Sequence, residues 1–267
     1  MRGLLVGLSM LAACGTYALD PNPHATMPPV IEHRSASPAA AVPASTTPNA
    51  EPPINVAPAP SMPVMPSPSV PALGGIDEAL FRRAERARAL GDLPGMRQAF
   101  MELVRDHPTS AYVPHAFFVF GDVALAEGKA EGAIRFFEKV TEFPDSNAAP
   151  FARYRIAWCR VQLGDDTTAL LDFLHASHEA HVVASDEARM LERACLLDST
   201  VAFARAGKLA HAETFYRNVT HGRDIDPEPL LARVAEAAMQ GDRGAELAVV
   251  CQKNGSPRWC ADALAQP

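Results

Sequence analysis

The sequence lacks the short motifs that mark the common catalytic sites. Its 267 residues contain no G-x-S-x-G nucleophile elbow, no phosphate-binding loop and no dinucleotide-binding glycine pattern. The cysteines are not closely paired, which argues against a zinc site. Since no residue pattern supports catalysis, we expect a protein that binds partners, is not an enzyme and carries no cofactor.

An excess of basic charge is missing as well. The chain has 24 Lys and Arg residues against 31 Asp and Glu residues, and the two signs are interspersed. A nucleic-acid groove would need Lys and Arg clustered on one face. We therefore expect no nucleic-acid partner, and the sequence indicates no small-molecule substrate.

The N-terminal residues have the composition of an export signal. Arg2 precedes an apolar run over residues 4–13 that is too short to span a bilayer. The run leads into the tetrapeptide LAAC, ending at Cys14, which resembles the lipobox of bacterial lipoproteins. This resemblance implies removal of residues 1–13 and lipidation of Cys14; the alternative is an ordinary secretory signal in which this cysteine is incidental. Gly15, and not Asp, follows the cysteine, which resembles lipoproteins sorted to the outer membrane, so we expect an exported protein anchored there and facing the periplasm.

Residues 14–75 are predicted to form a disordered linker. Fifteen of the 24 prolines fall between Pro21 and Pro71, and the segment has few charges and no periodicity. Such a composition cannot bury enough surface to offset the entropy of ordering, and dense proline favours extended polyproline II. The linker can be a passive spacer, a stalk that carries the folded domain away from the membrane, or a ligand for a groove-bearing partner.

A glycine recurs between helix-like stretches in residues 76–267. The five corners read ALGD, AEGK, QLGD, RAGK and MQGD, at spacings of 37, 36, 43 and 34 residues. A period of this length with a turn glycine is typical of helix-turn-helix solenoids, in which each helix pair packs against its neighbours. We therefore predict an all-α repeat domain with corners at Gly91, Gly128, Gly164, Gly207 and Gly241.

The clearest unit, residues 113–145, places small and large residues where two paired helices would meet. Gly121 and Ala133 allow close approach, Phe137 fills the groove beyond, and Pro144 stops the second helix. Matching positions are Phe117 and Gly128 in this unit, Ala157, Gly164, Ala169 and Phe173 in the third, Gly207, Ala212 and Tyr216 in the fourth, and Leu80, Gly91, Phe100 and Pro108 in the first.

These positions resemble the tetratricopeptide repeat pattern over about residues 77–220, with a degenerate half-repeat at Gly241 as a cap. The array departs from the pattern in three ways. The second unit lacks the tryptophan and tyrosine of the first helix, Arg153 and Arg160 occupy those places in the third unit, and about seven extra residues occur around positions 181–186. The resemblance implies a right-handed superhelix whose first helices line a concave, protein-binding face.

Five arginines on the expected first helices are candidates for that face. Arginine forms bidentate contacts with carboxylates and is common at interfaces. The alternative is that these side chains belong to ordinary solvated helix surfaces. The candidates are Arg153, Arg155, Arg160, Arg189 and Arg193.

With Cys14 assigned to lipid, four cysteines remain, an even number that permits two disulfides in an exported protein. Cys251 and Cys260 flank an Asn-Gly-Ser-Pro turn, and we expect a bridge between them that closes the C-terminal cap. Cys159 and Cys195 are expected on neighbouring first helices. The sequence is compatible with a second disulfide between them and equally with two buried free thiols.

Histidines are spaced three apart in the segment HASHEAH, at His175, His178 and His181. Neighbouring members of this set could chelate a metal on a helix surface, but the outer pair is rotated apart and the HExxH spacing is absent. A solvated helix end is the alternative, and we expect no metal site.

Taken together, these features resemble tetratricopeptide lipoproteins of bacterial envelope machines, such as those of outer-membrane assembly, pilotins and the Tol–Pal system. The resemblance implies a membrane-anchored periplasmic scaffold with protein partners in the cell envelope. Two alternatives are a periplasmic metal-binding or enzymatic protein that uses the three histidines, and a mainly structural tether that spans the wall.

Overall fold

A computed structural model describes residues 63–68, 74–183 and 185–264. Cys14, the expected signal peptide and the linker up to residue 62 lie outside these residues. Within them all regular structure is helical, which confirms the predicted all-α fold class. No helix of this part of the chain has the length and hydropathy to cross a membrane.

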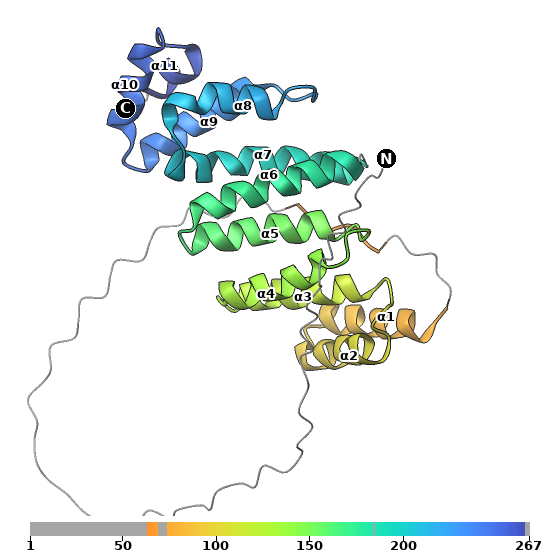
Figure 1. Cartoon of the computed structure of the whole chain (residues 1–267). Coiled ribbons are helices and arrows are strands. Elements are labelled where there is room, and N and C mark those ends of the chain that lie inside the picture. The colour runs from red at the N-terminus through yellow and green to blue at the C-terminus, as the bar shows by residue number, and fades with distance from the viewer. Residues whose placement is uncertain (1–62, 69–73, 184, 265–267) are drawn as a thin grey trace, which may run out of the picture. The chain divides into compact units, whose positions relative to one another are not determined.

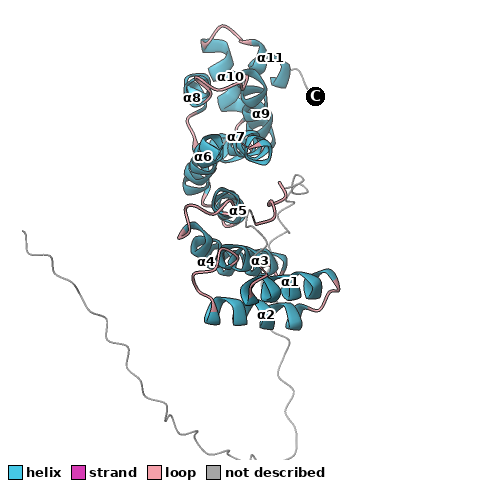
Figure 2. Ribbon diagram, turned by 90° about the vertical axis from the view of Figure 1, so that its right-hand side faces the viewer, coloured by secondary structure: helices cyan, strands magenta, loops and turns pink. Residues whose placement is uncertain are grey.

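The helices follow one another as antiparallel pairs stacked in chain order (Figures 1 and 2). The helices of the first three pairs pack against each other, and α2 with α3, α4 with α5, α6 with α7 and α7 with α9 connect the pairs into one array. The helices are α1 Ile76–Ala89, α2 Leu93–Asp106, α3 Val113–Ala126, α4 Ala130–Thr141, α5 Ala149–Gln162, α6 Asp166–Val183, α7 Asp186–Ala206, α8 Ala212–Val219, α9 Pro227–Gln240, α10 Gly244–Lys253 and α11 Arg258–Leu264, with a short 3₁₀ helix at Leu209–His211 before α8.

The first three corners share one backbone geometry. Gly91, Gly128 and Gly164 have φ values of +74°, +73° and +78°, in the left-handed region that glycine adopts without steric cost. The amide after each glycine bonds to a carbonyl five residues back, as in Lys129 to Ala124 at 2.9 Å. These bonds satisfy carbonyls at the helix end that would otherwise lack a partner.

The last two corners are built differently, although all five looked alike in the sequence. Gly207 has a φ of −78° and lies in extended backbone between the end of α7 and the 3₁₀ helix. At the final corner Asp242 takes the left-handed conformation with a φ of +60° in place of Gly241. The spacing between Gly164 and Gly207 is wider because α6 and α7, with 18 and 21 residues, are longer than the other helices.

The core runs along the array as three connected clusters of buried side chains. Phe117 packs against both the first cluster, in α1–α3, and the second, which extends from α3 to α7. Leu170 in turn joins the second cluster to the third, in α7–α11. The second-helix positions of the repeat pattern are fully buried: Ala133, Phe137, Ala169, Phe173, Ala212 and Tyr216 each have 0% exposure.

The C-terminal cap is closed by a disulfide between Cys251 and Cys260, whose Cα atoms lie 5.7 Å apart. The bridge joins α10 to α11, and both sulfurs are buried in the third cluster beside Trp259. Closing a short loop removes conformational freedom from the unfolded chain. The bridge therefore supports the part of the array that has the fewest neighbouring helices.

Arg243 holds this cap to the preceding pair through the end of α7. Its Nη1 atom donates to the carbonyl oxygens of Ala204 at 2.6 Å and Gly207 at 3.0 Å, while Nη2 lies 2.6 Å from Glu246. A cation at a helix C-terminus satisfies free carbonyls and interacts favourably with the helix dipole.

We expect the substitution Arg243→Ala to lower the free energy of unfolding by about 2 kcal/mol, because hydrogen bonds to a charged group are lost from partly buried carbonyls. Urea denaturation followed by circular dichroism measures this change. Arg205→Ala is the matched control: Arg205 is exposed and lies 3.5 Å from Asp166, so we expect less than about 0.5 kcal/mol. Equal losses in the two variants would contradict the capping role.

Candidate interaction surface

Three of the five candidate arginines are engaged in ion pairs between neighbouring helices. Arg153 Nε lies 2.9 Å from Glu179 Oε1, and Arg155 Nε lies 3.2 Å from Asp122 Oδ1. Arg160 donates to Asp172, whose carboxylate is nearly buried. The arginines of α5 therefore connect this helix to α3 and α6, and they contribute to the packing of the array.

The two arginines of α7 are more accessible. Arg189 pairs with Asp186 on the same helix and keeps 58% of its side chain exposed, and Arg193 is also exposed. Exposed ion pairs between neighbouring residues contribute little to stability. These two side chains are therefore the members of the predicted arginine face that remain accessible to a partner.

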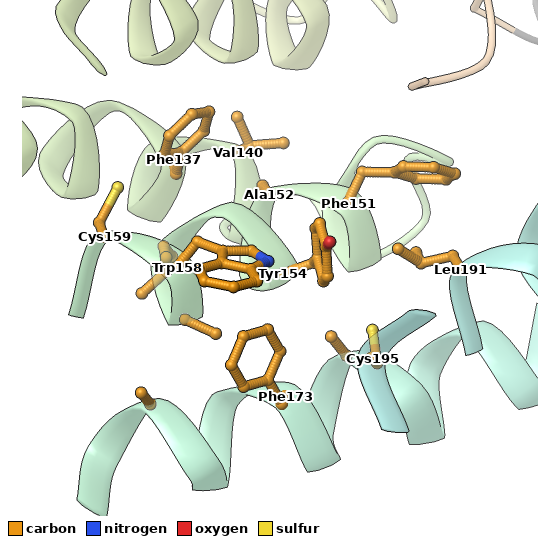
Figure 3. Close-up of a cluster of buried hydrophobic side chains, with 14 of the residues drawn as sticks. Phe137, Val140, Phe151, Ala152, Tyr154, Trp158, Cys159, Phe173, Leu191 and Cys195 are labelled. Carbon is orange, nitrogen blue, oxygen red and sulfur yellow. The ribbon is translucent and has the colours of Figure 1, made fainter. Parts of the chain in front are cut away.

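A buried carboxylate that sequence analysis did not single out joins α5 to α7. Asp198 Oδ2 accepts hydrogen bonds from Tyr154 Oη at 2.6 Å and Trp158 Nε1 at 3.2 Å. Burial raises the pKa of Asp198, and the two donors act in the opposite direction. Figure 3 shows Tyr154 and Trp158 over Phe173 of α6, with both ring centroids 5.7 Å from the Phe173 ring. This network fixes the relative position of three helices.

A second charged cluster connects the loop before α9 to α6 and α7. Arg223 Nη1 donates to Ser177 Oγ at 2.7 Å and to Glu192 Oε1 at 2.9 Å. The Arg223 and Glu192 side chains are only 15% and 7% exposed. His181 Nδ1 lies 3.0 Å from the same Glu192 oxygen. The cluster thus makes the single loop residue Arg223 a link between two repeat pairs.

The three spaced histidines do not converge on one point. His175, His178 and His181 are all exposed on α6, and His181 contacts Glu192. In the described part of the chain no three His, Cys, Asp or Glu side chains are arranged to hold a metal ion. Cys159 and Cys195 are free thiols buried in the second cluster, and burial raises the pKa of both.

An open groove of about 440 Å³ lies between the α2–α3 loop and the α4–α5 loop. Its wall includes His115 and Asn147, together with Ser110 and Pro144. His115 is only 2% exposed, and its ring lies close to the backbones of Pro66 and Ala111 and to the side chain of Asn147. Sequence analysis missed this groove, since no spacing pattern connects its two loops.

Burial lowers the pKa of His115 to about 4. In the unfolded chain His115 binds a proton near pH 6.5, whereas in the folded chain it stays neutral down to about pH 4. Protonation therefore favours the unfolded state as the pH falls from 6.5 to 4. We expect protonation of His115 in the unfolded chain to lower the free energy of unfolding by about 2 kcal/mol as the pH falls from 7 to 5.

Urea denaturation of wild type and His115→Gln at both pH values isolates this contribution, because other titrating groups act equally in both chains. The variant should lose less stability than wild type on acidification. His178→Gln, in which an exposed imidazole is removed, serves as the control and should keep the wild-type pH dependence. The same pH dependence in His115→Gln and wild type would count against the assignment.

The described residues define a class: an array of stacked α-helical hairpins. A family model described as tetratricopeptide repeat matches residues 78–110, which cover most of α1 and all of α2. A solved tetratricopeptide repeat protein from Parabacteroides merdae is similar in structure, with 12% sequence identity, a TM-score of 0.45 and 71% of each chain covered. A search of curated proteins finds no match.

Proposed function

We propose that this chain is a protein–protein interaction scaffold of the bacterial cell envelope, anchored to the outer membrane through lipid on Cys14. The observation that carries the proposal is the tetratricopeptide match at residues 78–110, on a helix pair that is followed by further pairs of the same kind. Stacked hairpins present a long continuous surface, and helical repeat proteins use such surfaces to bind other chains. The lipobox-like residues before Cys14 support the location.

The candidate contact surface for a partner is the exposed part of α7 around Arg189 and Arg193. Both guanidinium groups are accessible, in contrast with the arginines of α5, which pair with carboxylates of other helices. Arginine at an accessible helix face suits a partner with carboxylates, because its planar group forms two parallel hydrogen bonds. An acidic segment of an envelope protein fits this chemistry.

Site-specific photo-crosslinking in intact cells tests the scaffold role. A photoreactive amino acid at Arg193 should give one discrete adduct, which mass spectrometry then identifies. The matched control carries the same amino acid at Glu138, an exposed residue of the second helix α4, and should give none. The same adducts at both positions, or none at Arg193, would reject this face as the partner site.

The anchor is tested separately by Cys14→Ala. We expect this variant to lose labelling by a fatty-acid analogue and to move from the membrane fraction to the soluble periplasmic fraction. Stable anchoring needs more than one acyl chain. The lipid is attached at the thiol of Cys14 and at the N-terminus created by cleavage before it, and the alanine variant lacks the thiol. Retained labelling would show that Cys14 is not the lipidation site, while leaving the scaffold role open.

A further inference from the structure

Residues 63–68, which precede the repeat domain, lie beside the array near the α4–α5 loop (Figures 1 and 2). Residues 63–68, Pro-Val-Met-Pro-Ser-Pro, form no helix or strand. Their exposure is uneven: Val64 is 86% exposed, whereas Met65 is half-buried and packs against the second hydrophobic cluster. One face of the segment therefore contacts the array and the other faces solvent.

A polar contact fixes the position of the segment along the array. Asn147 Nδ2, in the loop before α5, donates to the Ser67 carbonyl oxygen at 3.0 Å. Proline has no N–H, and an extended proline-rich chain makes no internal hydrogen bonds, so its carbonyls need donors from elsewhere. Asn147 supplies such a donor across 80 residues of sequence.

The open groove lies beside this contact, and none of residues 63–68 lines it. His115 and Asn147 both line it, and the backbone of Pro66 and the side chain of Asn147 lie close to the His115 ring. His115 thus stands between the docked segment and the open volume. A neutral imidazole offers one donor and one acceptor, which suits a peptide backbone that presents carbonyl oxygens.

We propose that the surface beside this groove, at the α4–α5 loop, is a docking site for an extended, proline-flanked methionine segment, and that residues 63–68 of the same chain occupy it. Met65 is the apolar anchor and the Ser67 carbonyl is the polar one. The segment is joined to α1 at Ile76 by a few residues, so its effective concentration at this surface is of millimolar order and weak contacts suffice. The chain leading from the N-terminus then meets the array at α3–α5 instead of at α1. The inference stands whether or not the array binds another protein.

Peptide competition on the full-length chain tests the proposal. The probe is a fluorescent synthetic peptide with the sequence of residues 60–70, and binding is followed by fluorescence anisotropy. We expect Met65→Ser, which frees the docking surface, to bind the peptide at least tenfold more tightly than wild type does. Val64→Ser is the matched control, since Val64 is exposed, and should behave as wild type. Adding Asn147→Ala to Met65→Ser should weaken peptide binding again.

A second measurement needs no added peptide. Met65 in the wild-type chain should be oxidised by hydrogen peroxide at least threefold more slowly than the same methionine in the free peptide, and Asn147→Ala should remove this protection. Circular dichroism verifies that each variant keeps its helices. The proposal is overturned if all chains bind the peptide equally, if Met65→Ser binds none at several millimolar, or if Met65 is oxidised as fast in the chain as in the peptide.

Discussion

Replacing Phe137 with alanine should lower the free energy of unfolding by about 3–5 kcal/mol, because a fully buried aromatic ring leaves a cavity that its neighbours fill only in part. The ring has 0% exposure and lies in the second cluster, with its centroid 5.3 Å from that of Phe118. It also packs directly on Gly121 of the paired helix. Urea denaturation of the two chains measures the loss.

Because Phe137 contacts Gly121, the effects of Gly121→Ala and Phe137→Ala on the free energy of unfolding should not add. A Cβ atom at Gly121 would lie 2.5 Å from Phe137 Cε1, so Gly121→Ala should cost about 1–3 kcal/mol in the wild-type chain. In the Phe137→Ala background the clash is absent, and the same substitution should be neutral or stabilising by up to about 1 kcal/mol.

Gly132→Ala is the matched control within the same hairpin. Added at this position, a Cβ would meet Lys129 Cβ at 3.6 Å, an ordinary van der Waals contact. We expect the alanine there to be neutral or to stabilise helix α4 by up to about 1 kcal/mol in either background. If Gly121→Ala has the same effect in both backgrounds, the close approach at Phe137 is not what requires glycine.

The second large effect is expected at Glu192. Glu192→Ala should lower the free energy of unfolding by about 3 kcal/mol, because it leaves the partly buried guanidinium of Arg223 without its carboxylate. Arg223 would keep only the hydrogen bond to Ser177 Oγ. The loop before α9 would then lose its main link to α6 and α7, and thermal or urea denaturation should report the change.

Two controls separate the buried charge from a general effect of substitution. Glu192→Gln retains an oxygen that can accept from Arg223, so its cost should be smaller, about 1 kcal/mol. Asp186→Ala removes a carboxylate from an exposed pair on the same helix, and we expect a change below about 0.5 kcal/mol. Similar losses for Glu192→Ala and Asp186→Ala would mean that burial of the Arg223 pair has no energetic consequence.

The limits of sequence-based prediction are visible at the five corners. Gly91, Gly128 and Gly164 adopt the left-handed turn typical of such a glycine, because this preference depends on the residue itself. Gly207 does not: its φ is −78°, and its carbonyl oxygen accepts a hydrogen bond from Arg243, 36 residues further along the chain. A contact at that separation leaves no trace in the local pattern.

The arginines show the same distinction. Their placement on first helices follows from the periodicity, but the carboxylates that engage Arg153, Arg155 and Arg160 come from α6 and α3. Only the packing of neighbouring helices decides that these groups are paired while Arg193 is exposed. The candidate face stays a prediction, and α7 is its accessible part.

By itself, the sequence determined the all-α class, the hairpin boundaries and the small and large residues at the helix contacts. These depend on local preferences and on periodicity, which act over a few residues. The tertiary structure alone decided the burial of His115, the Asp198 and Glu192 networks, and the contact of Asn147 with the segment at Ser67. Those features join residues tens of positions apart, and they exist only once the helix pairs have stacked.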